Sequence, residues 1–394
     1  MMRFMKMINR FLSVSCLCIG MIACTQIKDT GNVKDKCDII DLSLRQEENL
    51  IPLSEISDSV HYIPLETSDS CLIGSVDKLL RTDDGNFIVV DKEVASSVLL
   101  FDSEGNFLNR IGCRGQGQSE YVMIEDVAYR DGCIYVWDGI QKKVIKYLEN
   151  GTFVETYLFD YTAYSMECVG EKLFAFCCDY TPNRSLYSDG QYPSLILFDA
   201  GTDEVTPYLY FDEKTNNTAY TSVLNNLYGG NLALPLNDTI YEVTGGGASA
   251  KYLLRYNKNY LSNKNAYIAK SQTEKMTADD TMKASIDEKF PQLISYFACD
   301  SLSLLFMRMG GFLYYGFYYP DSGIYKEASA CGKYPVVNDV DGSFLFSPRC
   351  VDGNRVYCLI EPSALSTRSK LPVDVEIEDN PILAEIYMRY NDED

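Results

Sequence analysis

The stretch that decides the fold is DGNFIVVDKEVASSVLLFDSEGNFL, residues 84–108. A second stretch, DGCIYVWDGIQKKVIKYLENGTFV at residues 131–154, follows the same pattern roughly 47 residues later. With a one-residue gap, the residues in register are Asp84 with Asp131, Asp91 with Asp138, Phe101 with Tyr147, Gly105 with Gly151 and Phe107 with Phe153. Matches in this order indicate an internal repeat, as in architectures built from similar units in series.

Both copies contain the same succession of short apolar runs and turns. An Asp-Gly turn precedes an apolar run, FIVV or IYVW, which ends in Asp. A second apolar run follows, then a turn that contains Gly, then a third run. Asp-Gly between apolar runs is a strong signal for a β-hairpin, and continuous apolar runs indicate strands that are buried on both faces. Small antiparallel sheets that recur about every 40–50 residues are typical of the blades of a β-propeller.

The rest of the chain contains looser copies of this unit. They lie at 170–179 with 194–205, at 229–243, at 310–319 with 323–329, and at 341–361. Residues 261–296 differ, because they are rich in Lys, Glu, Ala and Met, which favour a helix. The sequence therefore predicts an all-β fold, a six-bladed β-propeller with four-stranded antiparallel blades and one helical insertion at about 261–296.

Three segments, taken together with the repeat, resemble a known family. They are IPLETSDSCLIGSVDKLL at 63–80, IGCRGQGQSEY at 111–121 and EDNPILAEIYMRY at 378–390. The repeat resembles the NHL-type propeller blade, and the combination resembles the six-bladed β-propeller lipoproteins of Bacteroidota. In that family the glycine stretch usually runs IG-x-x-GQGPGEY, whereas here Gln118 and Ser119 replace the Pro and Gly. The resemblance implies six blades and a location in the cell envelope, and it implies no settled activity.

The N-terminus has the features of an export signal. Three basic residues, Arg3, Lys6 and Arg10, precede an apolar run at 11–22. This run is too short to span a bilayer, which needs roughly 20 apolar residues. The ending Met-Ile-Ala-Cys resembles a bacterial lipobox, and this resemblance implies that Cys24 carries a lipid anchor. The alternative is an ordinary signal peptide followed by an incidental cysteine.

This reading of the N-terminus sets the expected domain organisation. We expect a lipoprotein signal peptide at 1–23, a lipidated flexible tether at 24–37 and a propeller domain at 38–394. The tether is polar and has no apolar periodicity, as in flexible linkers. Thr25 follows the cysteine, and by analogy with bacterial lipoprotein sorting we expect the outer membrane, on either its periplasmic or its surface face.

Composition narrows the class of partner. The net charge of −21 argues against nucleic acid, whose phosphate backbone requires cationic partners. The 14 cysteines include two in the signal and Cys24, and the remaining ones form no Cys-x-x-Cys pair. We interpret most of them as small buried hydrophobic residues, and no disulfide pairing follows from the sequence. The adjacent Cys177 and Cys178 are expected on opposite faces of a strand.

The glycine-rich stretch 111–121 has two interpretations. A phosphate-binding loop requires a helix after the glycines, and the Walker pattern requires a lysine that is missing here. Because β-branched and aromatic residues follow Tyr121, the stretch is predicted to connect one blade to the next. Its residues Arg114, Gln116, Glu120 and Tyr121 then fall near the entry to an inner strand. They either bind a ligand at a mouth of the ring or pack between blades.

Catalytic and metal-binding patterns are sparse. His61 is the sole histidine in the sequence, which excludes sites built from several histidines. Residues 338–343 resemble a calcium loop but lack its closing Glu, which favours a hairpin turn. We therefore assign no catalytic residue, no metal ligand and no cofactor. The 56 acidic residues leave carboxylate pairs of the glycoside-hydrolase kind open. Some of the 30 tyrosines could present rings to a glycan, whereas most are expected to pack between blades.

These observations favour a lipid-anchored, non-enzymatic binding or scaffolding protein for a glycan or for a protein partner in the envelope. The alternative is a propeller enzyme, a glycoside hydrolase or lyase that uses carboxylates and tyrosines at the mouth of the ring. Two carboxylates that converge in the central funnel with strongly perturbed pKa values would favour the enzyme. Residues 380–390 and 38–44 both have strand patterns, and because a propeller must close, we expect the termini to meet in the same or adjacent sheets.

Overall fold

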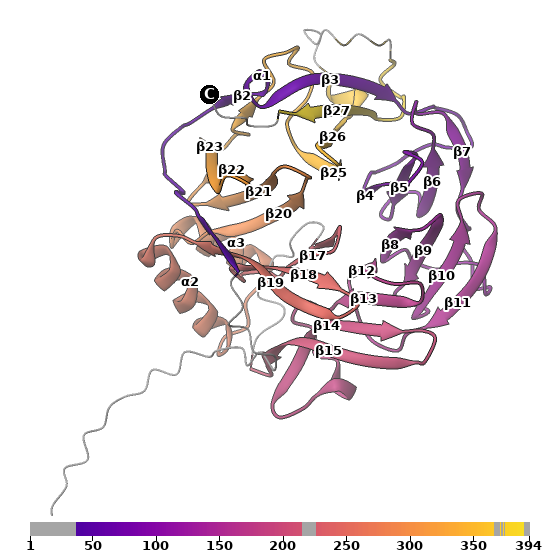
Figure 1. Cartoon of the computed structure of the whole chain (residues 1–394), viewed down its shortest axis with the longest axis horizontal. Coiled ribbons are helices and arrows are strands. Elements are labelled where there is room, and N and C mark those ends of the chain that lie inside the picture. Colours follow the sequence, from indigo (N-terminus) through magenta and orange to yellow (C-terminus); the bar gives the residue numbers. More distant parts are fainter. Residues whose placement is uncertain (1–36, 215–225, 366–370, 372, 374, 390–394) are drawn as a thin grey trace, which may run out of the picture.

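The computed structural model describes residues 37–214, 226–365, 371, 373 and 375–389. Six sheets surround a central axis and close into a ring (Figure 1). Each sheet has four antiparallel strands, and one sheet carries a fifth strand. The predicted six-bladed β-propeller is confirmed. The predicted signal peptide, Cys24 and nearly all of the tether lie outside the described residues, and no helix among those described is long and apolar enough to cross a bilayer.

The blades follow one another along the chain. The first blade consists of β4 (Lys78–Arg81), β5 (Phe87–Asp91), β6 (Ser97–Phe101) and β7 (Phe107–Arg110). The second consists of β8 (Asp126–Arg130), β9 (Cys133–Asp138), β10 (Lys143–Leu148) and β11 (Phe153–Leu158). The third consists of β12 (Ser165–Cys168), β13 (Leu173–Cys177), β14 (Gln191–Asp199) and β15 (Glu204–Asp212). The fourth blade consists of β16 (Leu227–Tyr228), β17 (Asn231–Ala233), β18 (Thr239–Thr244) and β19 (Gly247–Arg255). The fifth consists of β20 (Gln292–Ala298), β21 (Ser303–Met309), β22 (Phe312–Tyr319) and β23 (Ile324–Cys331). The sixth consists of β25 (Pro348–Asp352), β26 (Arg355–Ile360), β27 (Ile382–Met388) and β3 (Ser57–Pro64). Smaller elements are the parallel pair β2 (Ile51–Pro52) and β24 (Val336–Val337), the helix α1 (Leu53–Ile56), and the 3-10 turns Arg184–Leu186 and Pro362–Ala364.

The ring closes in the sixth blade, where strands from both ends of the chain pair. β27 pairs antiparallel with β3, and Leu383 lies opposite Ile63. The C-terminal strand thus completes a blade with an N-terminal strand, but the expectation that residues 38–44 and 380–390 meet in the same or adjacent sheets is wrong. β1 (Asp38–Asp41) pairs in parallel with β19 as the fifth strand of the fourth blade. The alternation correctly indicates a half-buried strand, because Ile40 is buried between exposed neighbours, but alternation does not specify which sheet edge a strand joins.

The helical insertion is shorter than predicted. It consists of α2 (Lys258–Ser271) and α3 (Ala278–Asp287), and α3 begins with a capping box formed by Thr277 and Asp280. The predicted range 261–296 is wrong at its end, because β20 occupies residues 292–298. Lys289 has a positive φ of 54° and Pro291 follows, so the backbone cannot continue as a helix beyond this point. The predicted sixth blade also begins later than residue 341, because β25 is its first strand.

The hydrophobic core lies between neighbouring blades. Trp137 of β9, for example, packs against Phe176 of β13 with a distance of 5.2 Å between ring centroids. Cys177 and Cys178 belong to different core clusters, which confirms that they lie on opposite faces of the third blade. All eleven described cysteines are free thiols, and six of them are buried.

The repeated Asp residues have the same structural role in the first two blades. Asp91 ends β5 and Asp138 ends β9, and each carboxylate accepts hydrogen bonds from backbone N–H groups of two loops. The donors are Ser75 and Val94 for Asp91, and Val122 and Gln141 for Asp138. One loop precedes the innermost strand of the blade and the other follows the second strand. The sequence repeat therefore reflects a repeated anchor that ties these two loops together.

Candidate functional site at the central channel

The innermost strands of the six blades surround a channel with a cavity at each end. These strands are β4, β8, β12, β16, β20 and β25. Residues at or near their beginnings line a cavity of about 370 Å³, which we call the entry cavity. Residues at or near their ends line a cavity of about 790 Å³, which we call the exit cavity. Both volumes lie in the range of roughly 300–1,000 Å³ that is usual for small-molecule sites.

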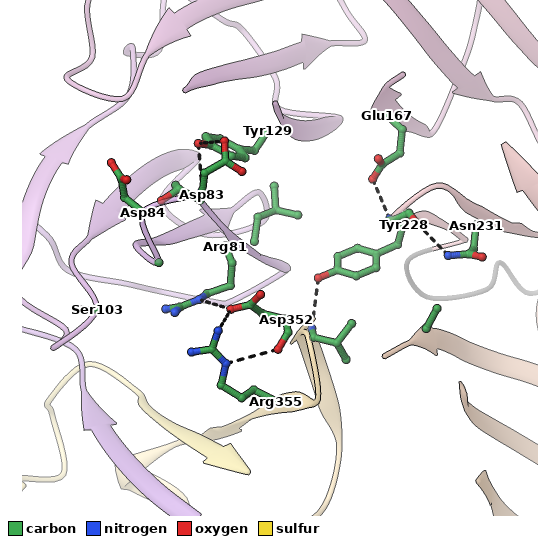
Figure 2. A pocket seen from close by; sticks show the side chains of 16 residues that line it. Arg81, Asp83, Asp84, Ser103, Tyr129, Glu167, Tyr228, Asn231, Asp352 and Arg355 are labelled. Atoms are coloured by element: carbon green, nitrogen blue, oxygen red, sulfur yellow. Dashed lines mark hydrogen bonds and ion pairs between the residues drawn. The ribbon is translucent and has the colours of Figure 1, made fainter. Parts of the chain in front are cut away.

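Two arginines and one aspartate form an ionic cluster in the exit cavity (Figure 2). Asp352, at the end of β25, accepts a hydrogen bond from Nη2 of Arg355. Its carboxylate also lies 3.6 Å from Nε of Arg81, at the end of β4. The Arg81 guanidinium lies 4.2 Å from the centre of the Phe87 ring, which adds a cation–π contact. The cluster thus joins the first and sixth blades and fixes two planar guanidinium groups at the cavity wall.

Hydroxyl groups and a half-buried carboxyl line other parts of the exit cavity. The Tyr129 hydroxyl donates to Glu149 at 2.9 Å and lies 3.2 Å from an Asp83 carboxylate oxygen. Glu167, on β12, accepts a hydrogen bond from the backbone N–H of Gly229 at 3.2 Å. Burial raises the pKa of the Glu167 carboxyl above its ordinary value, and nearby Lys78 offsets this only in part.

The charged groups of the exit cavity suit a polar ligand, and two of its carboxyl groups lie in different electrostatic environments. Glycoside hydrolysis commonly uses two carboxyl groups on either side of the scissile bond, with different protonation states. In this cavity Glu167 has a raised pKa, whereas Asp352 is held by two guanidinium groups. The cavity therefore offers polar anchors of both charges, and one carboxyl whose pKa is raised by burial.

A buried ion pair links the innermost strands of the first three blades near the entry cavity. Lys78 of β4 donates from Nζ to Asp126 of β8 at 2.9 Å, and both side chains are almost fully buried. The other carboxylate oxygen of Asp126 accepts from the backbone N–H of Met166 in β12. Burial alone would raise the pKa of Asp126, but the ammonium groups of Lys78 and Lys92 outweigh it and hold this pKa below its ordinary value.

The predicted ligand-binding residues lie together in the loop between β7 and β8. Tyr121 is buried and its hydroxyl donates to the carbonyl of Ile111, and Glu120 accepts from the backbone N–H of Gly117. Arg114 and Gln116 are exposed. None of the four predicted residues, Arg114, Gln116, Glu120 and Tyr121, is among the residues that line the two cavities. A role in binding stays a prediction for these four residues.

The loop itself is a blade connection, as the sequence indicates. Its carbonyl groups accept from Lys143 of β10 at Gly117 and from Thr156 of β11 at Gln118, so it packs on the second blade. Gly112 has a φ of +64°, and a Cβ there would lie 2.5 Å from the Tyr147 hydroxyl, so both conformation and space require glycine. The strand β8 follows the loop, where a phosphate-binding loop would have a helix.

The other sequence candidates lie away from the cavities. His61 is on the outermost strand β3, where Nδ1 lies 3.5 Å from Glu385 and 60% of the side chain is exposed. In the 338–343 turn, Asp341 accepts hydrogen bonds from Asn338 and Ser343 of the same turn. Across the part of the chain that the structure describes, no three His, Cys, Asp or Glu side chains gather as a metal site would require.

A family model matches residues 37–387, which is most of the chain. The chain belongs to the DUF4934 family. This family is described as a domain of unknown function. No curated protein matches the DUF4934 chain.

Two solved structures from Bacteroides share the ring. One of them is a Bacteroides fragilis protein that is expected to be exported. It is 14% identical to this chain, with a TM-score of 0.64 over 90% of this chain and 100% of that one. A DUF4221 family member from Bacteroides vulgatus is 11% identical, with a TM-score of 0.51 over 88% of this chain and 99% of that one. At this level of identity the likeness concerns the fold alone. The NHL-type and lipoprotein details of the resemblance stay expectations.

Sequence reasoning missed the residues that line the channel. Some of them could have been found from the Asp-Gly turns, because in the first two blades the innermost strand ends just before such a turn. Arg81 lies three residues before Asp84-Gly, and Tyr129 lies two residues before Asp131-Gly. Glu167 has no such signal, because the third blade of this DUF4934 chain has no Asp-Gly turn after its first strand.

Proposed function

We propose that this DUF4934 chain is a lipid-anchored protein of the bacterial outer membrane that binds a hydroxyl-rich ligand, such as a glycan, in the exit cavity without transforming it. The observation that carries the proposal is the ionic cluster of Arg81, Asp352 and Arg355 at the end of the innermost strands. Guanidinium and carboxylate groups held in fixed positions offer several donors and acceptors to the hydroxyl groups of a sugar.

The rest of the cavity wall supports this class of ligand. Three wholly apolar side chains are among its lining residues, namely Leu80, Ala298 and Val351, and most of the others carry hydroxyl, amide or charged groups. Such a wall suits a ligand whose own surface is largely polar, since an apolar ligand would leave the polar groups of the wall without partners.

Binding to a panel of neutral oligosaccharides, measured by titration calorimetry, tests the proposal. At least one member of the panel should bind, and Arg355→Ala should weaken its binding by about tenfold, because a charged anchor is lost. Arg45→Ala is the matched control, since Arg45 is a surface residue with 74% of its side chain exposed. The proposal fails if no oligosaccharide binds, or if the Arg355 variant binds as tightly as the unaltered chain.

The anchor has its own test. The sequence around Cys24 and the family resemblance support lipidation, so Cys24→Ser should move the protein from the membrane fraction to the soluble fraction. The same change should abolish labelling by a fatty-acid analogue. A Cys24→Ser protein that stays in the membrane fraction would show that the anchor lies elsewhere.

One observation favours glycoside cleavage as a second candidate function. The raised pKa of Glu167 is the property of a general acid in glycoside hydrolysis. An oligosaccharide that binds should then be cleaved, with new reducing ends that a colorimetric assay detects, and Glu167→Gln should abolish the cleavage. Binding without release of reducing ends would leave the binding function and remove the enzymatic one.

A further inference from the structure

The entry cavity contains charged residues whose partners can be traced one by one. Its lining includes three carboxylates, Asp77, Asp126 and Asp179, and three cations, Lys78, Lys92 and Arg349. The cavity also differs from the exit cavity in its aromatic wall, which the fifth blade and the following loop provide. Its ligand preference therefore follows from which charges remain without partners.

The three carboxylates already accept hydrogen bonds. Asp77 accepts from the backbone N–H groups of Lys92 and Glu93, at 2.7 and 3.2 Å. Asp126 is held by Lys78 and by the backbone N–H of Met166, as described above. Asp179 accepts from the side-chain amide of Asn226 at 2.7 Å. Each carboxylate thus already has at least one protein donor, which makes it a poorer site for a cationic ligand.

Both lysines are engaged as well. Lys78 forms the short contact with Asp126, and its side chain is 4% exposed. Lys92 donates to the backbone carbonyl of Glu125 at 2.5 Å and lies 3.8 Å from Asp126. Their charges are largely neutralised by partners within the wall.

Arg349, near the start of β25, differs from the two lysines. Its guanidinium has no hydrogen bond or ion pair with the residues that the structure describes, and its Nε is buried without an acceptor. It partly offsets the rise in pKa that burial causes in Glu361, but the two form no ion pair. The residue as a whole is half-buried and lines the cavity, so the terminal nitrogens of its guanidinium are the donors left for a ligand oxygen.

A stack of aromatic rings forms the wall contributed by the fifth blade and the following loop. Phe306 lies between Tyr315, with centroids 4.4 Å apart, and Tyr334, with centroids 5.8 Å apart, and the three rings are nearly parallel. Phe306 and Tyr334 are partly exposed, and both line the cavity with Arg349. Rings of this kind provide an apolar face against which a sugar ring can pack.

We infer that the entry cavity binds a small acidic sugar of the hexuronate class, with Arg349 holding the carboxylate and the partly exposed Tyr334, at the end of the stack, contacting the sugar ring. The planar guanidinium fork matches the two oxygens of a carboxylate. One unpaired cation among three carboxylates favours a monoanion over a phosphate dianion, which the carboxylates would repel. The inference concerns a different cavity from the proposed function and does not depend on it.

Titration of the full-length chain with glucuronate, followed by calorimetry at neutral pH, tests the inference. We expect saturable binding, and we expect glucose, the neutral match, to bind at least about tenfold more weakly, because it lacks the charge. Inorganic phosphate serves as the other anionic probe and should bind more weakly than glucuronate. If glucuronate does not bind, or if phosphate or glucose binds as tightly, the inference is overturned.

Substitutions at two lining residues test whether glucuronate binds in the entry cavity. Arg349→Gln should weaken glucuronate binding at least about tenfold, whereas Arg45→Gln, which removes one positive charge from an exposed side chain, should leave it unchanged. Tyr334, whose ring is partly exposed, provides a second variant of the same cavity if the Arg349 variant does not fold. Tyr334→Ala should weaken the binding of glucuronate, because the sugar ring loses its apolar contact. Unaltered glucuronate affinity in either folded variant would overturn the assignment to this cavity.

Discussion

Asp91 shows how a single residue organises the ring. Its carboxylate accepts from the backbone N–H groups of Gly74 and Ser75 before β4 and of Val94 and Ala95 after β5. Burial alone would raise the pKa of Asp91, but these hydrogen bonds outweigh it and hold the pKa below its ordinary value. The residue thus stabilises two loops beside the channel in its ionised form.

Asp91→Ala should lower the free energy of unfolding by at least about 2 kcal/mol, because several backbone donors lose their acceptor. The measurement is chemical denaturation of the variant beside the unaltered chain. Asp84→Ala, which changes an exposed residue of the turn before β5, should shift the free energy of unfolding by less than about 0.5 kcal/mol. Equal shifts in the two variants would contradict this role for Asp91.

The same residue predicts a response to acid. Because the pKa of Asp91 is depressed in the fold, its contribution is fully present above the ordinary value of about 3.9 and is lost as the pH falls through the lower folded value. The melting temperature of the unaltered chain should therefore fall more steeply than that of Asp91→Ala as the pH is lowered below about 4.

At the scale of elements, β27 is the strand on which the ring depends most. It lies between β26 and β3 and pairs with both along almost its whole length. Six of its seven residues are buried. By contrast, β1 is an added fifth strand with a single neighbour, and one of its four residues is buried.

Truncation after Asn380 should therefore destabilise the protein by several kcal/mol, a large share of a typical stability of roughly 5–15 kcal/mol. The test is thermal unfolding followed by circular dichroism. Removal of residues 38–41 is the matched control, because it also deletes one strand, and it should lower the melting temperature much less. If the truncated protein melts at the same temperature as the full chain, the ring does not depend on β27.

At the scale of the whole molecule, the packing between blades keeps six of the eleven described thiols away from solvent. The buried cysteines are Cys71, Cys168, Cys177, Cys178, Cys350 and Cys358, whereas Cys113 and Cys331 are exposed. Burial raises the pKa of Cys168 to about 11 and that of Cys350 to about 12. Because the thiolate is the reactive form, both access and ionisation disfavour reaction at the buried positions.

Treatment of the folded protein with iodoacetamide at about pH 8, followed by peptide mass spectrometry, should label Cys113 and Cys331 first. The six buried cysteines should react only after the protein is unfolded with denaturant, which serves as the positive control. Equal labelling of buried and exposed cysteines in the native protein would contradict the packing between blades.

The parts of the molecule that could be predicted from sequence are those with local signals. Asp-Gly turns and apolar runs mark the first two blades, whereas β16 and β17 are two and three residues long, and the sequence shows only the looser match at 229–243 there. The partner of β1 and the identity of β3 as the closing strand depend on packing between distant segments. The channel residues are harder still, because Arg349 and Glu167 become a site only when the innermost strands surround one axis.

The pairing of β3 with β27 has a consequence for how the protein is made. Asn380 donates from its backbone N–H to Thr67, 313 residues earlier, so the sixth sheet forms only after the chain has been synthesised through β27. Contacts between such distant segments form slowly, and until then the edges of β3 and β26 have no partners. A product of interrupted synthesis that ends before residue 382 keeps those edges open, where they invite aggregation or proteolysis. Because β27 completes the sixth sheet, only chains that contain β27 close the ring.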